Sequence, residues 1–399
     1  MDLSYGAEHG RFRARVRTFL VQNWDIGRAE DREYVAQFRR AATSAGLLYR
    51  TVPAEYGGAG QEPDAMRAQV VREEFGQARA PREVGGVGTA LLVPTLLRWG
   101  TPEQKRRFVP PTVAGELRWC QGYSEPDAGS DLESLRTTAV ADGGEWVVSG
   151  QKVWTSDAAR ADWMFLLART ELNQPRRAGL SYLLLEMRKP GVEVRPLRQI
   201  TGSSEFNEVF LTGARTPLDL LVGGRGQGWA VSRTTLAAER TTLAAPDTSA
   251  ALYASLVKLA RRADAGGGRG LSDPGVRSEL MRLRGWIEAQ RYSAMIQASR
   301  DFSATATAAS GTDANDILQL LNKLVHTEVA MRVSRIALDL LGPASYLDPS
   351  LSPRPGNERW LNQFFGSLGV AIAGGTSNIQ RNIVAERGLG LPRDEAVSP

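Results

Sequence analysis

The pattern of apolar residues changes twice along the chain, and these changes restrict the possible folds more than any other feature. Residues 8–118 contain segments, such as 12–21 and 64–79, in which apolar side chains recur at helical spacing. From 119 to about 222, short apolar runs separated by Gly, Pro and Asp are typical of β-strands. After 228 the spacing is helical again. The sequence therefore predicts a helical region, a β region and a second helical region.

The boundaries of individual elements follow from the same patterns. Thr101 followed by Pro102 predicts a helix start, since Thr caps helix N-termini and Pro suits the first turn. The run Gly223–Gly228 predicts a turn before a helix, because its glycines lack the dinucleotide-binding spacing. Strands are expected at Glu145–Gly150, Trp163–Ala168, Ser181–Met187, Val192–Pro196 and Val209–Leu211, and long helices near 229–262, 276–301, 315–341 and 376–388.

These elements predict an α+β multidomain fold. We expect an N-terminal α-helical domain over residues 1–118 and a middle antiparallel β-barrel-like domain over 119–228. The remaining residues, 229–399, are expected to form a C-terminal four-helix bundle.

The scarcity of cysteine and histidine excludes several kinds of enzyme. The 399 residues include one cysteine, Cys120, and two histidines, His9 and His326. Zinc sites built from these residue types need three or four ligands, so no metal site is expected. A dithiol pair is excluded, and so are nearly all nucleophile systems that depend on histidine. An enzyme of this composition is expected to use a bound organic cofactor.

Charge and hydropathy exclude two classes of partner. The net charge is +5, and basic residues occur in nothing longer than short doublets such as Arg261–Arg262, so nucleic-acid binding is not expected. The chain has no apolar run long enough to cross a membrane and no signal-peptide pattern at its start. Together with the single thiol, this favours a cytoplasmic protein.

Two short strings could bind a flat heteroaromatic cofactor. Trp119–Asp131 reads WCQGYSEPDAGSD and offers hydroxyls and backbone amides in a loop, and Lys152–Ser156 places Trp154 among hydroxyl residues. Such a cofactor needs an aromatic wall and a few hydrogen-bond donors. Taken alone, a tryptophan such as Trp154 is more often a core residue, and a loop rich in Ser, Gly and Asp is usually an ordinary turn.

The strings EPDAGSD and SGQKVWTS, together with the C-terminal GGTSNIQRNIVAERGLG, resemble the acyl-CoA dehydrogenase family of flavoproteins. Other segments of the sequence are similar to the bacterial branch of this family that acts on long, branched or sterol side-chain thioesters. The resemblance implies FAD-dependent α,β-dehydrogenation of an acyl thioester to the trans-2-enoyl thioester, with flavin N5 as hydride acceptor. The substrate would be an acyl-CoA or an acyl-carrier-protein thioester, and an electron-transfer flavoprotein would take the electrons. A homotetramer or heterotetramer is expected.

The resemblance also implies roles for individual residues. Ser124 would donate near the flavin ring, Trp154 would cover the ring, and the start of the last helix would contact the adenosine half. The complete FAD-binding set is Gln121, Tyr123, Ser124, Gly129, Ser130, Trp154, Ser156, Thr376 and Asn378. The substrate-binding set is Ser130, Arg240, Gly374 and Gly375.

The catalytic base is expected at an unusual position. Many relatives carry a Glu just before the C-terminal Gly-Thr, but this chain has Gly374 there and no Asp or Glu within 359–385. Some relatives instead place a Glu before an Arg on the first bundle helix, which matches Glu239 and Arg240. Apolar neighbours would raise the pKa of that carboxyl. Without the resemblance, the same two residues could be a solvated helical pair; the reserve candidates for the base are Glu205, Glu208 and Glu328.

Two other functions remain open on the same fold. A flavin monooxygenase would need reduced flavin from a reductase and would need no base for the α proton. A noncatalytic partner subunit would be expected to have lost the flavin-binding strings, but both are intact in this sequence.

Two further motifs of the family differ in this chain. The family's Arg-x-x-Phe-Gly motif is not recognisable around Asp273–Leu280, and Asp339–Pro343 replaces its Gln-x-x-Gly-Gly segment. FAD contacts between subunits are therefore expected to differ, and a heteromer is possible.

Overall fold

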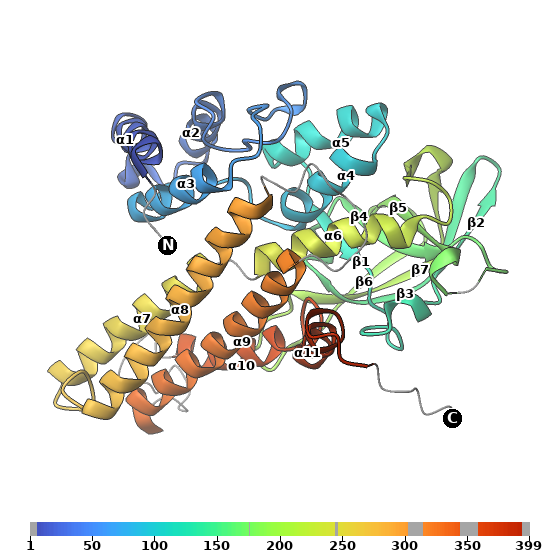
Figure 1. Cartoon of the computed structure of the whole chain (residues 1–399). Helices are drawn as coiled ribbons and strands as arrows, with labels where there is room; N and C mark the ends of the chain where they lie inside the picture. Colours follow the sequence, from blue (N-terminus) through green and yellow to red (C-terminus); the bar gives the residue numbers. More distant parts are fainter. Residues whose placement is uncertain (1–5, 175, 244–245, 302–313, 344–357, 393–399) are drawn as a thin grey trace. The chain divides into compact units, whose positions relative to one another are not determined.

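The structure is a computed structural model that describes residues 6–174, 176–243, 246–301, 314–343 and 358–392. The chain divides into two compact units, one ending at Glu239 and the other beginning at Arg240 (Figure 1). The order of helical, β and helical regions agrees with the prediction.

The first unit begins with helices that build an apolar core. They include α1 (Gly6–Asn23), α2 (Arg32–Ser44), α3 (Ala65–Ala78), α4 (Val93–Trp99) and α5 (Pro102–Ala114). The predicted start of α5 is confirmed, because Thr101 and Gln104 form a capping box there. Phe75 and Phe108 are fully buried in a cluster that also contains side chains from the sheet, such as Phe165.

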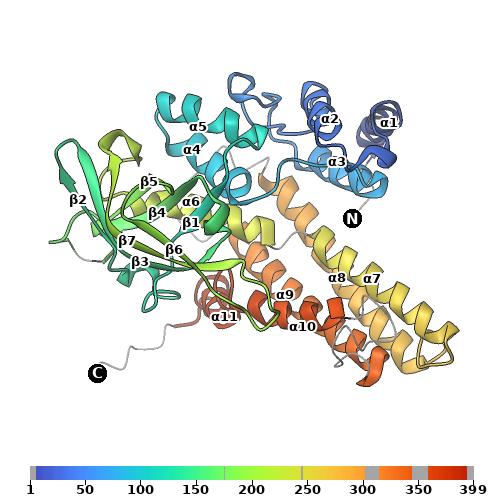
Figure 2. The ribbon, with the colours of Figure 1, turned by 180° about the vertical axis from the view of Figure 1, so that it is seen from behind.

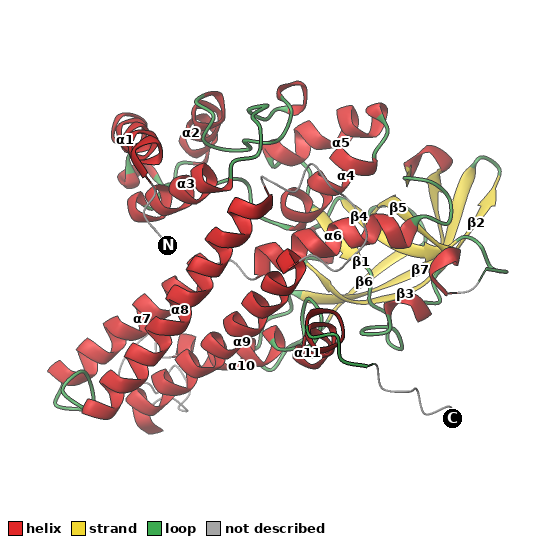
Figure 3. Ribbon diagram, viewed as in Figure 1, coloured by secondary structure: helices red, strands yellow, loops and turns green. Residues whose placement is uncertain are grey.

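The sheet of the first unit has eight strands, ordered β6-β7-β3-β2-β4-β5-β8 with β1 beside β4 (Figure 3). The strands are β1 (Trp119–Gly122), β2 (Thr138–Asp142), β3 (Glu145–Ser156), β4 (Trp163–Arg169), β5 (Leu180–Glu186), β6 (Val192–Pro196), β7 (Phe206–Pro217) and β8 (Leu221–Val222). The sheet is open and mainly antiparallel, and β1 and β2 each pair with β4 in parallel. The patterns predicted neither β1 nor β2.

Both faces of the central strand β4 are buried. Phe165 and Leu167 pack with the helices, whereas Met164, Leu166 and Ala168 belong to a second cluster with Trp146 and Val209. Burial on both faces explains why β4 reads as a continuous apolar run rather than an alternating one. Figure 2 shows the same sheet from behind.

The second unit is a helical bundle around α9 (Ala314–Leu341), which contacts α7 (Pro246–Ala265), α8 (Pro274–Asp301), α10 (Glu358–Val370) and α11 (Ser377–Ile383). Within the helix predicted at 229–262, the structure describes α6 (Gly228–Leu243) and α7, and residues 244–245 between them lie outside the described residues. The patterns missed α10, whose two glycines weaken its helix propensity.

Candidate functional site

The two motif strings lie side by side in the first unit. β1 leads into the loop that contains Ser124, and the backbone N–H of Val153 in β3 donates to the Ser124 carbonyl oxygen at 2.9 Å. β1 must also approach β4 closely, because a Cβ at Gly122 would lie 2.4 Å from the Met164 sulfur. The predicted neighbourhood of the loop and the Trp154 strand is therefore present in the fold.

Trp154 is not a core residue. Its side chain is 61% exposed, and its φ of 58° lies in the left-handed region, which is unusual for an aromatic residue. The pairing of β3 with β7 contains one extra β3 residue between Lys152 and Thr155, so this segment is a β-bulge. The bulge turns the indole outward. Its one aromatic neighbour among the described residues is Phe206, which lies edge-on to it with 5.9 Å between the ring centroids.

The other predicted flavin residues of this unit differ in exposure. Ser124 and Ser156 are half-buried, while Gly129 and Ser130 are exposed in the loop that follows Glu125. Tyr123 instead packs its ring edge-on against Phe165 and Tyr182. Burial raises the pKa of the Tyr123 hydroxyl well above its ordinary value. Its side chain is thus part of the core.

A buried ion pair between the two strings was missed by the sequence patterns. The Lys152 ammonium donates to Glu125 Oε1 at 2.8 Å, and the two side chains are 0% and 7% exposed. Burial lowers the pKa of Lys152 to about 8, although Glu125 opposes this shift. Burial alone would raise the pKa of Glu125, but the nearby ammonium and its hydrogen bonds lower it. A lysine directly before the apolar pair Val153 and Trp154 in β3 was the available signal.

Glu239 lies beside one of the predicted flavin residues. It is half-buried on α6, and the side-chain amide of Gln121 in β1 donates to Glu239 Oε2 at 3.5 Å. The fold thus joins two candidate residues 118 positions apart. α6 is fixed one turn earlier, where the hydroxyls of Thr235 and Thr95 are 2.9 Å apart and the indole N–H of Trp99 donates to the Thr234 hydroxyl.

The reserve carboxylates differ from Glu239 in exposure or in their hydrogen-bond partners. Glu205 is exposed, Glu208 on β7 accepts a hydrogen bond from the Gln151 amide at 2.9 Å, and Glu328 on α9 pairs with Arg332 at 2.7 Å. Among the described residues, Glu239 is the one of these four carboxylates with a side-chain hydrogen bond to β1, which leads into the motif loop.

The C-terminal candidates belong to the second unit. Gly374 and Gly375 have φ values of 62° and 90°, so the turn before α11 favours glycine at both positions. The side-chain amide of Gln380 donates to the Gly374 carbonyl oxygen at 3.0 Å, and the Thr376 hydroxyl caps α11 by accepting from the Ile379 N–H. Asn378 is exposed. The side chain of Arg240 lies outside the described residues.

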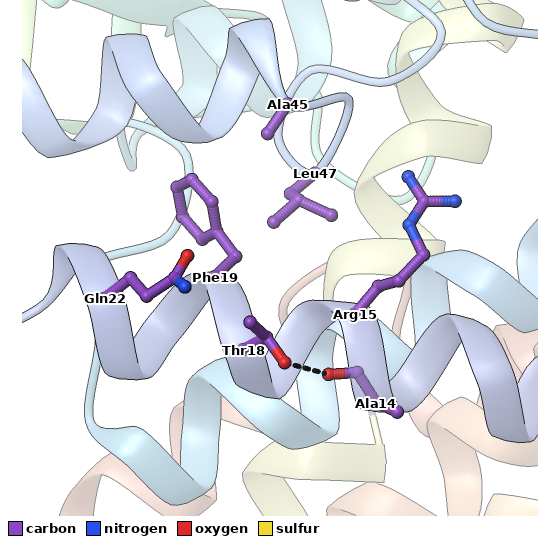
Figure 4. Close-up of a pocket in the computed structure, with 7 residues that line it drawn as sticks. All are labelled: Ala14, Arg15, Thr18, Phe19, Gln22, Ala45 and Leu47. Atoms are coloured by element: carbon purple, nitrogen blue, oxygen red, sulfur yellow. Dashed lines mark hydrogen bonds between the residues drawn. The ribbon is translucent and has the colours of Figure 1, made fainter.

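A hollow on the N-terminal helices contains none of these residues. It has a volume of about 390 Å³ and lies between α1 and the turn after α2 (Figure 4). Its lining is mostly apolar, with Arg15 as the single charged residue, and it lacks a carboxylate. Nothing in that lining matches the chemistry that the motifs predict.

The part of the chain that the structure describes contains neither a candidate metal-binding cluster nor a candidate membrane-spanning helix. No group of three or more His, Cys, Asp or Glu side chains there could hold a metal ion. Among the same residues, no helix has both the length and the apolar character needed to cross a bilayer.

Comparison with known proteins covers nearly the whole sequence. Residues 6–116, 120–213 and 226–389 match the models of the N-terminal, middle and C-terminal domains of acyl-CoA dehydrogenase. The acyl-CoA dehydrogenase IpdE1 of Mycobacterium tuberculosis is 40% identical, over 96% of this chain and 98% of the relative.

Two solved structures, each named for two proteins, have folds similar to that of this chain. The ChsE4–ChsE5 complex of Mycobacterium tuberculosis matches with a TM-score of 0.77 and 30% identity, over 98% of this chain and all of that chain. The Tcur3481–Tcur3483 steroid ACAD matches with the same TM-score and identity, over 99% of this chain and all of that one.

Proposed function

Because the chain belongs to the acyl-CoA dehydrogenase family, whose members are FAD-dependent oxidoreductases, we propose that it oxidises an acyl thioester to the trans-2-enoyl thioester with Glu239 as the base. The observation that carries the assignment of the base is the placement of Glu239 beside Gln121. A half-buried carboxylate at this position suits removal of the proton from the carbon α to the thioester.

The residues around the motif loop fit a flavin. Trp154 offers an exposed aromatic face, and Ser124 and Ser156 offer half-buried hydroxyls on the adjoining segments. FAD bound there would supply the group that accepts the hydride from the β carbon. Gly129 and Ser130 would lie along the FAD phosphates, and Thr376 and Asn378 would contact its adenosine half. Ser130, Arg240, Gly374 and Gly375 would contact the thioester substrate.

The substrate class and partners follow from the relatives. A steroid ACAD and a two-protein complex are among the similar structures, which favours a sterol-derived or branched acyl group and a heterotetramer over a homotetramer. The thioester carrier is CoA in this proposal, and an electron-transfer flavoprotein accepts the electrons. A carrier-protein thioester is the alternative, and it is tested by adding acyl-carrier-protein thioesters to the titration described below.

The proposal is tested by anaerobic titration of the purified flavoprotein with a panel of acyl-CoAs while flavin bleaching is recorded. Glu239→Gln is expected to retain bound FAD but to bleach at least about a hundredfold more slowly, since this is the typical contribution of a general base. Glu208→Gln is the control and should bleach at the wild-type rate. Near-normal bleaching by Glu239→Gln moves the base elsewhere, and turnover that requires NADH, a reductase and oxygen indicates a monooxygenase.

A further inference from the structure

The carboxylate of Glu125 connects three segments of the chain. Glu125 Oε1 accepts hydrogen bonds from the Lys152 ammonium at 2.8 Å and from the backbone N–H of Thr137 at 2.9 Å. Glu125 Oε2 accepts from the backbone N–H of Arg136 at 2.6 Å. The motif loop, the segment before β2 and the strand β3 therefore meet at one buried group.

Lys152 makes a second connection to the motif loop. Its ammonium also donates to the carbonyl oxygen of Tyr123 at 3.2 Å. Lys152 is fully buried, and Glu125 is the one carboxylate within 4.0 Å of it among the described residues. A buried charge that loses its partner is strongly destabilising, so the two groups hold each other in one arrangement.

Both members of the pair are close in sequence to residues proposed to face FAD. Ser124 immediately precedes Glu125 in the loop, and Trp154 follows Lys152 by two positions on the bulge. The amide of Asn207 in β7 fixes the far side of the bulge by donating to the Thr155 carbonyl oxygen at 2.9 Å. A shift of Lys152 would therefore move both Trp154 and the loop.

We propose that Lys152 and Glu125 are positioning residues for the cofactor: their buried ion pair holds Ser124 and the left-handed Trp154 in the arrangement that binds FAD. Neither side chain needs to touch the cofactor for this role. The inference rests on the proposed FAD site, and it adds two residues that the motif roles do not include.

The test compares FAD binding by the wild-type chain with that of two variants. The single variant Lys152→Met removes the cation and leaves the Glu125 carboxylate buried without its partner. The double variant Lys152→Met/Glu125→Leu leaves no unpaired buried charge, so it is expected to fold even if the single variant does not. Dissociation constants for FAD are measured by titration, and the visible circular dichroism of bound FAD reports on the surroundings of its ring. Arg215→Met is the control, because it removes a cation from an exposed pair with Asp142 in the same sheet.

Both variants are expected to bind FAD roughly ten- to a hundredfold more weakly, the range seen when partners that orient metal-ligating side chains are removed. Their visible circular dichroism should also change, while Arg215→Met should match the wild type in both measurements. A double variant that binds FAD with the wild-type constant and spectrum overturns the inference, because the pair would then contribute only to stability. A wild-type chain that binds no FAD instead refutes the proposed cofactor, so the two failures are distinguishable.

Discussion

At the residue scale, Trp154 combines three features that a purely structural tryptophan rarely has. It is mostly exposed, it lies on a bulge, and its backbone is left-handed. The left-handed conformation costs a non-glycine residue about 1–2 kcal/mol. Strain of this kind persists where the surrounding structure enforces it, and it is concentrated at functional sites. Here Asn207 and the Lys152–Glu125 pair enforce it.

Trp154→Gly is therefore expected to separate stability from binding. The free energy of unfolding should change by less than about 1 kcal/mol, because glycine relieves the left-handed strain while little buried area is lost. FAD affinity should fall because the aromatic wall is gone. Urea unfolding and FAD titration measure the two effects, and Trp154→Phe is the control that keeps an aromatic face. A loss of about 3 kcal/mol or more, as for a core tryptophan, would contradict this view of the residue.

At the element scale, the glycine-rich turn before α6 has a steric reason. A Cβ on Gly228 would lie 2.6 Å from the Cα of Ser181 in β5, so the first turn of α6 touches the backbone of the sheet. The N–H of Gly226 also donates to the Ser181 hydroxyl at 2.9 Å. The sequence predicted the turn, but its spacing contains no sign of this close approach. α6 carries Glu239, so the approach bears on the position of the base.

Gly228→Ala is expected to destabilise the protein by about 1–3 kcal/mol, the usual cost of overpacking, and to slow flavin bleaching by acyl-CoA as α6 is displaced. Urea unfolding and the anaerobic titration measure these effects. The matched control is Gly76→Ala in α3, where a new Cβ would meet nothing within 4 Å and should leave stability equal or up to about 1 kcal/mol higher. If Gly228→Ala has the stability and bleaching rate of the wild type, the β5 backbone accommodates the added methyl group and α6 is not displaced.

At the scale of the whole molecule, the two units differ in what fills their interiors. The first unit buries the ion pair between its two motif strings. The second contains a buried His326 on α9, whose Nδ1 lies 2.9 Å from the Ser249 hydroxyl on α7. Burial lowers the pKa of His326, and nearby Lys323 contributes to the same shift. Burial in the bundle therefore favours the neutral form of this imidazole.

This neutral histidine predicts a loss of stability in acid. Because the unfolded chain binds a proton near pH 6.5 and the folded chain only at lower pH, the free energy of unfolding should fall as the pH drops below about 6.5. His326→Gln should show a shallower decline between pH 7 and 5 in urea unfolding. His9→Gln is the control for the loss of an imidazole elsewhere. An unchanged slope in His326→Gln would mean that other groups cause the decline.

Local sequence patterns predicted the order of helical and β regions and the start of α5, and they contain the strings that identify the family. These features depend on residues near one another in the chain, where apolar spacing, capping and turn chemistry act directly. The domain limits at 118 and 228 and the roles of the site residues remain predictions.

The folded chain was needed to show that Trp154 is exposed, that Lys152 pairs with Glu125 and that Gln121 contacts Glu239. Each depends on where distant segments fold back on one another, and a single extra residue in β3 reverses the face on which a side chain lies. Local patterns carry no record of such a shift, because the register between two strands is a property of the pair.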